Sequence, residues 1–125
     1  MSGRARYPVF FANLVYAAVL LALGVAPGVP AIASNVSDHI AHTAAYALQA
    51  VLLFLLFLPA NGRALAAVLA AVAAAAYGGF VEMLQVFQPT RTVEVLDIGA
   101  NALGAGMAAS LAYLVTHPKR VGRGG

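Results

Sequence analysis

The chain is short, strongly apolar and poor in charge, which excludes an ordinary water-soluble protein. Its 125 residues suffice for one domain. Only 9% of them are charged, whereas a soluble domain carries about 25%. The net charge of +3 does not require a nucleic-acid partner, because membrane proteins concentrate Lys and Arg at their cytoplasmic ends. The chain has no cysteine, which excludes disulfides and thiolate metal sites.

Long runs without charge predict four transmembrane helices. A helix needs roughly 20 apolar residues to cross a bilayer. The predicted helices cover Phe10–Ala26, His39–Leu58, Ala64–Phe87 and Val95–Val115. A soluble four-helix bundle would need polar faces, which the run from Arg63 to Phe80 lacks. A transmembrane barrel would need alternating polarity, which is also absent. We therefore expect one all-α membrane domain, a four-helix bundle over residues 1–125.

The first predicted helix has some features of a signal peptide. Arg4 and Arg6 precede an apolar run, and residues 31–34 read AIAS, which resembles a cleavage site. The run is longer than the roughly 7–15 apolar residues of a signal peptide. We therefore expect the helix to be retained and to end before Pro27 and Pro30.

The basic residues predict the orientation of the bundle. With four crossings, six of the seven fall on one side: Arg4, Arg6, Arg63, Lys119, Arg120 and Arg123. Only Arg91 falls on the other side. The positive-inside rule then makes both termini cytoplasmic. The four acidic residues gather at the outer end: Asp38, Glu82, Glu94 and Asp97.

Each of the last three predicted helices carries a polar stripe at its outer end. Spacings of three or four residues place side chains on one helix face, and polar groups turn away from lipid tails. We expect a cluster between these helices, formed by His42, Tyr46, Glu82, Gln85, Asp97 and Asn101. Asp38 lies one turn above His42, and the segment after Pro89 carries Arg91 back over the cluster. Small residues around Gly104 favour a close helix contact.

Two segments resemble the VanZ-like family of small bacterial membrane proteins. They read DHIAHTAAY, from Asp38, and EMLQVFQPTRTVEVLDIGANALGA, from Glu82. The residues that match the family pattern are Asp38, His42, Tyr46, Glu82, Gln85, Pro89, Arg91, Asp97, Asn101 and Gly104. The resemblance covers the second to fourth helices, about two-thirds of the chain.

The resemblance implies the fold, the site and a place in the bacterial cytoplasmic (inner) membrane. The family is named for a protein linked to resistance to the glycopeptide antibiotic teicoplanin. Three positions depart from the usual pattern. His39 stands where lysine is common, Thr43 where phenylalanine is common, and Glu94 where a small polar residue is usual. His39 removes a fixed positive charge at the outer side, and Glu94 adds a negative one.

The favoured function is recognition or transport of a lipid- or glycan-linked cell-envelope precursor or head group. The partners are then membrane lipids and this precursor, with no nucleic acid. The predicted binding residues are Asp38, His42, Tyr46, Glu82, Gln85, Arg91, Asp97 and Asn101. Arg91 is the expected anion contact, since its planar fork suits phosphate or carboxylate. Four carboxylates against one arginine leave −3, so the site needs protons, charged histidines, a cation or an amine-bearing ligand.

Two other functions stay open on the sequence alone. In the first, Glu82, Asp97 and His42 are the general acid and base of an enzyme, or hold a divalent metal ion. No HExxH, GxSxG or phosphate-binding loop supports a particular reaction, and no cofactor is otherwise predicted. In the second, the polar residues only join helices in a structural subunit.

Overall fold

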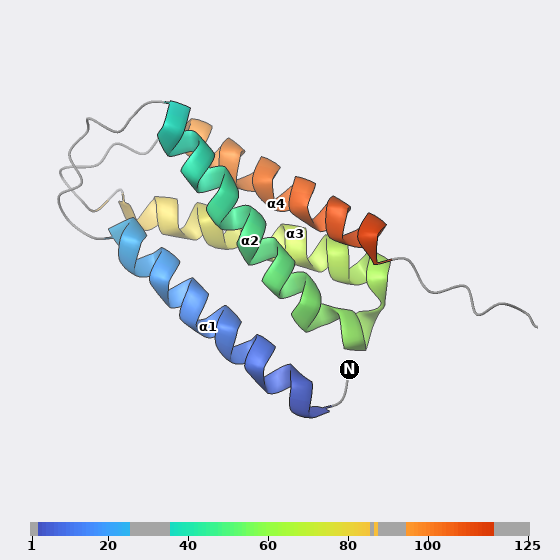
Figure 1. Cartoon of the computed structure of the whole chain (residues 1–125). Coiled ribbons are helices and arrows are strands. Elements are labelled where there is room, and N and C mark those ends of the chain that lie inside the picture. Colours follow the sequence, from blue (N-terminus) through green and yellow to red (C-terminus); the bar gives the residue numbers. More distant parts are fainter. Residues whose placement is uncertain (1–2, 26–35, 86, 88–94, 117–125) are drawn as a thin grey trace, which may run out of the picture.

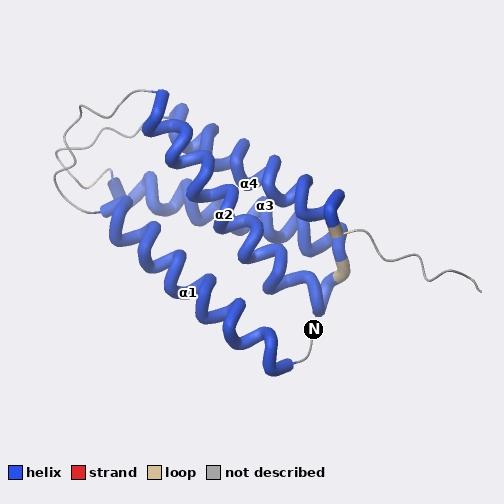
Figure 2. Tube along the Cα trace, viewed as in Figure 1, coloured by secondary structure: helices blue, strands red, loops and turns tan. Residues whose placement is uncertain are grey.

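The protein is a bundle of four helices (Figure 1). The computed structural model describes the backbone of residues 3–25, 36–85, 87 and 95–116, and the side chains of 4–24, 40–85, 87 and 97–116. The helices are α1 (Gly3–Val25), α2 (Val36–Asn61), α3 (Arg63–Gln85) and α4 (Val95–Val115). Figure 2 shows helix through nearly all of the described part, which contains no strand. The predicted all-α fold is confirmed.

All four helices are long and apolar enough to cross a membrane. Large apolar side chains lie on the outside of the bundle: Leu23, Val72 and Met107 are 64%, 63% and 63% exposed. Such a surface suits lipid tails rather than water. The chain is therefore a multi-pass membrane protein. The start of α1 and the end of α4 lie at the same end of the bundle (Figure 1). Which side of the membrane this end faces remains a prediction.

Helix ends differ from the predicted ones by one to seven residues, except in α4, which spans Val95–Val115 as expected. α1 begins at Gly3 instead of Phe10, and α2 extends from Val36 to Asn61, through Pro59. α3 ends at Gln85 rather than Phe87. The predictions followed the limits of the apolar runs. At the start of α1 and at both ends of α2, helix continues beyond those limits, because interfacial residues form helix as well as apolar ones do.

A single glycine joins α2 to α3. Gly62 has a φ of 75°, in the left-handed region that glycine adopts without strain. Its N–H donates to the Leu58 carbonyl at 3.2 Å, which ends α2. Its own carbonyl accepts from the Ala66 N–H at 3.0 Å, which starts α3. This short turn makes the two helices antiparallel neighbours.

The core of α2, α3 and α4 is built in layers of small side chains. Buried residues repeat at every fourth position: Tyr46, Ala50 and Phe54 on α2, Ala66, Ala70, Ala74, Gly78 and Glu82 on α3, and Asn101, Ala105 and Ala109 on α4. One layer joins Ala50, Ala74 and Ala105. Small residues let helices pack closely in a membrane, where dispersion contacts drive association.

Gly104 brings α4 against the backbone of α2. A Cβ atom at position 104 would lie 2.3 Å from the carbonyl oxygen of Thr43. Beside it, the Thr43 hydroxyl donates to the Ala100 carbonyl at 3.4 Å. The close contact expected from the small residues of the fourth helix is confirmed.

Polar side chains attach α1 to α2 and α3, which the sequence analysis did not predict. Asn13 Nδ2 donates to the Leu52 carbonyl at 3.0 Å, and the Tyr16 hydroxyl donates to the Ala45 carbonyl at 2.7 Å. From α3, Tyr77 donates its hydroxyl to a main-chain carbonyl of α1. α1 therefore lies on the side of the bundle formed by α2 and α3.

Arg63 joins two helices at the end of the bundle opposite to Glu82 and Asp97. Its Nη1 donates to the Thr116 carbonyl at 2.9 Å, and its guanidinium carbon lies 4.2 Å from the centre of the Tyr113 ring. A cation at the carboxyl end of a helix is favourable because the last carbonyls carry partial negative charge. The start of α3 is thereby tied to the end of α4.

Gly62→Ala should destabilise the protein by about 1 kcal/mol, the cost of a left-handed L-residue. No atom of the described residues lies within 4 Å of the added Cβ, so the expected cost is that of the backbone conformation. Gly62→Asn should cost less, because asparagine tolerates this conformation. Unfolding in mixed dodecyl maltoside and SDS micelles measures both. Equal stability of Gly62→Ala and the wild type would contradict the assigned turn.

Gly104→Ala should destabilise the protein by about 1–3 kcal/mol, the usual cost of overpacking, because the added methyl meets the Thr43 backbone. Gly106→Ala, two residues away, is the matched control, since its Cβ would have no neighbour within 4 Å in the described part of the chain. It should be neutral or stabilising by up to about 1 kcal/mol, because alanine favours helix. The same unfolding assay compares them. Equal effects of the two substitutions would show that α2 and α4 do not touch at position 104.

Candidate functional site

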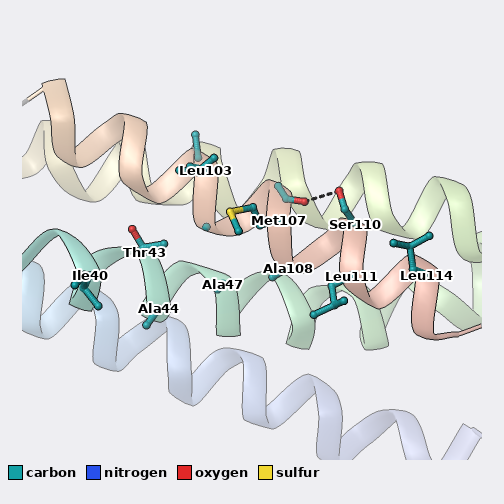
Figure 3. Close-up of a pocket in the computed structure, with 13 residues that line it drawn as sticks. Ile40, Thr43, Ala44, Ala47, Leu103, Met107, Ala108, Ser110, Leu111 and Leu114 are labelled. Atoms are coloured by element: carbon teal, nitrogen blue, oxygen red, sulfur yellow. Dashed lines mark hydrogen bonds between the residues drawn. The ribbon is translucent and has the colours of Figure 1, made fainter.

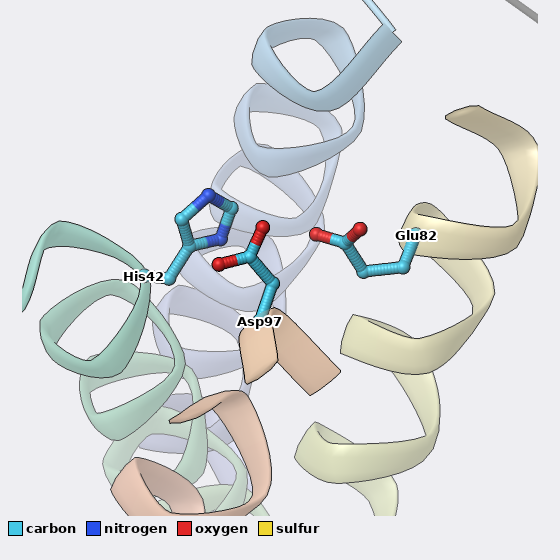
Figure 4. A group of neighbouring side chains, drawn as sticks. All are labelled: His42, Glu82 and Asp97. Carbon is cyan, nitrogen blue, oxygen red and sulfur yellow. The ribbon is translucent and has the colours of Figure 1, made fainter. Parts of the chain in front are cut away.

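Three ionisable side chains from three helices meet near one end of the bundle. They are His42 of α2, Glu82 of α3 and Asp97 of α4 (Figure 4). Each offers a nitrogen or oxygen atom, and these atoms all lie within 4.8 Å of one another. Glu82 is 1% exposed and Asp97 7%, while His42 is partly buried. Each of the three takes part in polar or electrostatic interactions. We call this group the polar layer.

The polar layer continues the layered core of the bundle. One helical turn deeper lie Tyr46 below His42, Gly78 below Glu82, and Asn101 below Asp97. These three are in contact: a Cβ at Gly78 would lie 3.0 Å from Asn101 Nδ2 and 3.1 Å from Tyr46 Cε1. The missing side chain at position 78 thus makes room for the two larger ones. The same four-residue repeat that stacks the alanines also brings the ionisable groups together.

Asn101 is a buried amide without an evident structural role. It is 1% exposed, and neither Nδ2 nor Oδ1 has a hydrogen-bond partner within the described part of the chain. Leaving a buried polar group unsatisfied costs about 1–3 kcal/mol. Asn13, in contrast, donates from Nδ2 to two carbonyls and accepts a bond from Gln49 at 3.4 Å. Asn13 therefore joins helices by hydrogen bonds, whereas Asn101 packs between helices without a hydrogen bond to any described residue.

The structure brings together five of the six side chains that were expected to cluster. These are His42, Tyr46, Glu82, Asp97 and Asn101. The sixth, Gln85, is buried but turns toward α1, where its Nε2 donates to the Gly24 carbonyl at 2.8 Å. Its expected place between α2, α3 and α4 was wrong.

Two predicted binding residues fall outside what the structure describes. Arg91 lies outside the described residues, as does Glu94, and the Asp38 side chain lies outside the described side chains. Their roles remain predictions.

Side chains of α1 contact α2 close to the site, and these contacts of α1 were not predicted. Gln49 is buried and bonds to Asn13. Next to Tyr46, the Ala45 carbonyl accepts a hydrogen bond from the Tyr16 hydroxyl of α1 at 2.7 Å. The available signal was the polar Asn13 in an otherwise apolar run.

The polar layer concentrates negative charge in a region of low dielectric. Two ionised carboxylates at this separation repel one another strongly. A proton, an imidazolium or a bound cation relieves the repulsion. The layer is therefore suited to binding protons, metal ions or positively charged ligand groups.

An apolar groove runs along the outside of the bundle between α2 and α4, which carry two of the three residues of the polar layer (Figure 3). Its volume is about 930 Å³. Its larger lining residues are Ile40, Leu103, Met107, Leu111 and Leu114. Thr43 and Gly104 also line it, so it begins beside the contact that joins α2 to α4. The Ser110 hydroxyl donates a hydrogen bond to the Gly106 carbonyl of the same helix at 2.7 Å, so its hydrogen-bonding capacity is met within α4.

Comparison with known proteins identifies the family. The VanZ/LLP1 family model matches residues 28–116. This range contains α2, α3 and α4, and therefore the whole polar layer, while α1 lies before it. Neither the curated proteins nor the solved structures gave a match. The sequence resemblance is confirmed over most of the chain, and the protein belongs to the VanZ/LLP1 family.

Proposed function

We propose that this protein recognises the polar head group of a cell-envelope lipid or lipid-linked glycan precursor at the outer face of the bacterial cytoplasmic membrane. The observation that carries the proposal is the buried polar layer of His42, Glu82 and Asp97. Ionisable groups inside a membrane are costly and mark functional sites. The unsatisfied amide of Asn101 beneath them supports a binding role over a structural one.

The depth of the layer suits a head group. Glu82 lies three residues before the end of α3, and Asp97 is the third residue of α4. At about 1.5 Å per residue, both lie within roughly 5 Å of a helix end. A lipid head group reaches this depth without leaving the interface. By the positive-inside rule this end faces outward.

The groove between α2 and α4 favours a ligand with a hydrocarbon chain. His42 and Asp97 belong to the same helices that line the groove, and Ile40 and Thr43 flank His42 in sequence. The groove is lined almost entirely by apolar side chains. An amphiphile can therefore place its head at the polar layer and an acyl chain along the groove. The proposed outer cation is Arg91, whose guanidinium would contact an anionic group of the head.

The test is to identify what the purified protein carries. Wild-type protein extracted in a mild detergent should retain one class of envelope lipid or lipid-linked glycan in native mass spectra. Glu82→Gln and Asp97→Asn keep the side-chain shape but remove the charge, and each should reduce the bound fraction at least tenfold. The matched control is Met83→Leu, because Met83 neighbours Glu82 but is 66% exposed toward lipid.

Retention of the same ligand by all four proteins would contradict the proposal, as would a wild-type protein that carries only bulk membrane phospholipid in proportion to its abundance. Circular dichroism and gel filtration of each variant show whether the fold is kept. Loss of ligand in Met83→Leu as well would assign the binding to the lipid-facing surface instead of the polar layer.

A further inference from the structure

We propose that His42, Glu82 and Asp97 together bind a divalent transition-metal ion of the zinc class. This metal site goes beyond head-group recognition and does not depend on it. The three residues come from α2, α3 and α4, so a bound ion would join the three helices that form the core of the bundle.

The geometry is close to that of a three-ligand site. In a tetrahedral zinc site with bonds of about 2.0–2.2 Å, neighbouring ligand atoms lie about 3.3 Å apart. The ligand atoms of the three side chains lie within 4.8 Å of one another. Rotation of the Glu82 and Asp97 side chains can close this difference of roughly 1.5 Å without moving a helix. Three protein ligands leave a fourth position for water or a ligand oxygen, as in catalytic rather than structural zinc sites.

The kinds of ligand atom determine the class of metal. One imidazole nitrogen with two carboxylate oxygens suits zinc and its first-row neighbours. Calcium takes six to eight oxygen ligands and magnesium requires octahedral oxygen coordination, which this set does not supply.

Asn101 is a second and independent indication of a bound group. It lies one turn below Asp97, between the helices, and its amide has no hydrogen-bond partner among the described residues although it is 1% exposed. Residues around metal ligands usually hydrogen-bond to them or to bound water. A metal-bound water that reaches down from the layer would satisfy this amide.

The charges of the site balance with a dication. Glu82 and Asp97 supply two negative charges, and His42 coordinates as a neutral imidazole. A divalent ion therefore leaves the layer neutral, which removes the repulsion between the two carboxylates. The open position on the ion could then accept an anionic oxygen of a head group. Only this last step rests on the proposed function.

The experiment uses full-length protein with its affinity tag removed, since a histidine tag itself binds zinc. After dialysis against EDTA and then zinc chloride, elemental analysis should find one zinc ion per chain. Titration should show that His42→Gln, Glu82→Gln and Asp97→Asn each weaken zinc binding at least tenfold. The matched control is His117→Gln, which removes a histidine 20 residues after Asp97 in the sequence, and should leave the affinity unchanged.

X-ray absorption of the zinc-loaded wild type tests the site without any variant. The expected first shell has one imidazole and otherwise oxygen. Two or more imidazoles, no retained zinc, or unchanged affinity in properly folded variants of the three ligands would overturn the proposal. Native mass spectra of the zinc-free protein separate the two proposals: a lipid retained without zinc leaves head-group recognition standing when the metal site fails.

Discussion

The backbones of α2 and α4 touch where the Thr43 carbonyl oxygen occupies the space that a side chain at position 104 would need. The rest of the structure depends on this contact and on the alanines that extend it. In lipid, no hydrophobic force draws apolar helices together, so close packing of small residues has to hold them. The alanine layer of Ala50, Ala74 and Ala105 continues the contact toward α3. This packing sets the register of the three helices.

That register also brings the ionisable side chains together. His42, Tyr46 and Ala50 follow one another at four-residue intervals on α2, and the other two helices repeat the pattern. The layers of the core are therefore apolar near Arg63, and the polar layer lies at the opposite end of the bundle. Hydrogen bonds between membrane helices contribute only about 0.6 kcal/mol each. The polar layer is thus a weak source of stability beside the alanine packing, which supports the proposed binding role.

Much of this arrangement was predictable from the sequence. Charge-free runs of sufficient length fix the number of helices, and the four-residue spacing of His42, Tyr46, Glu82, Asp97 and Asn101 fixes the face on which each lies. The spacing alone does not predict which neighbouring helix packs against that face. Gln85 lies about 60° around the helix from Glu82, at ~100° per residue, and this offset turns it to α1. The position of α1 was not predictable either, because its polar residues bond to main-chain carbonyls of other helices, which have no sequence signature.

In the proposed function, the polar residues around the site serve binding, while those that face α1 hold the fold together. Unfolding free energies of Asn13→Ala and Asn101→Ala in mixed micelles test it most directly, because both asparagines are buried and the substitution is the same. Asn13 loses hydrogen bonds to two carbonyls and to Gln49, so its variant should be less stable by about 1–2 kcal/mol. Asn101 loses no hydrogen bond within the described residues, so its variant should lose less than half as much. An Asn101→Ala variant destabilised as strongly as Asn13→Ala would show that the amide supports the fold, and would contradict the claim.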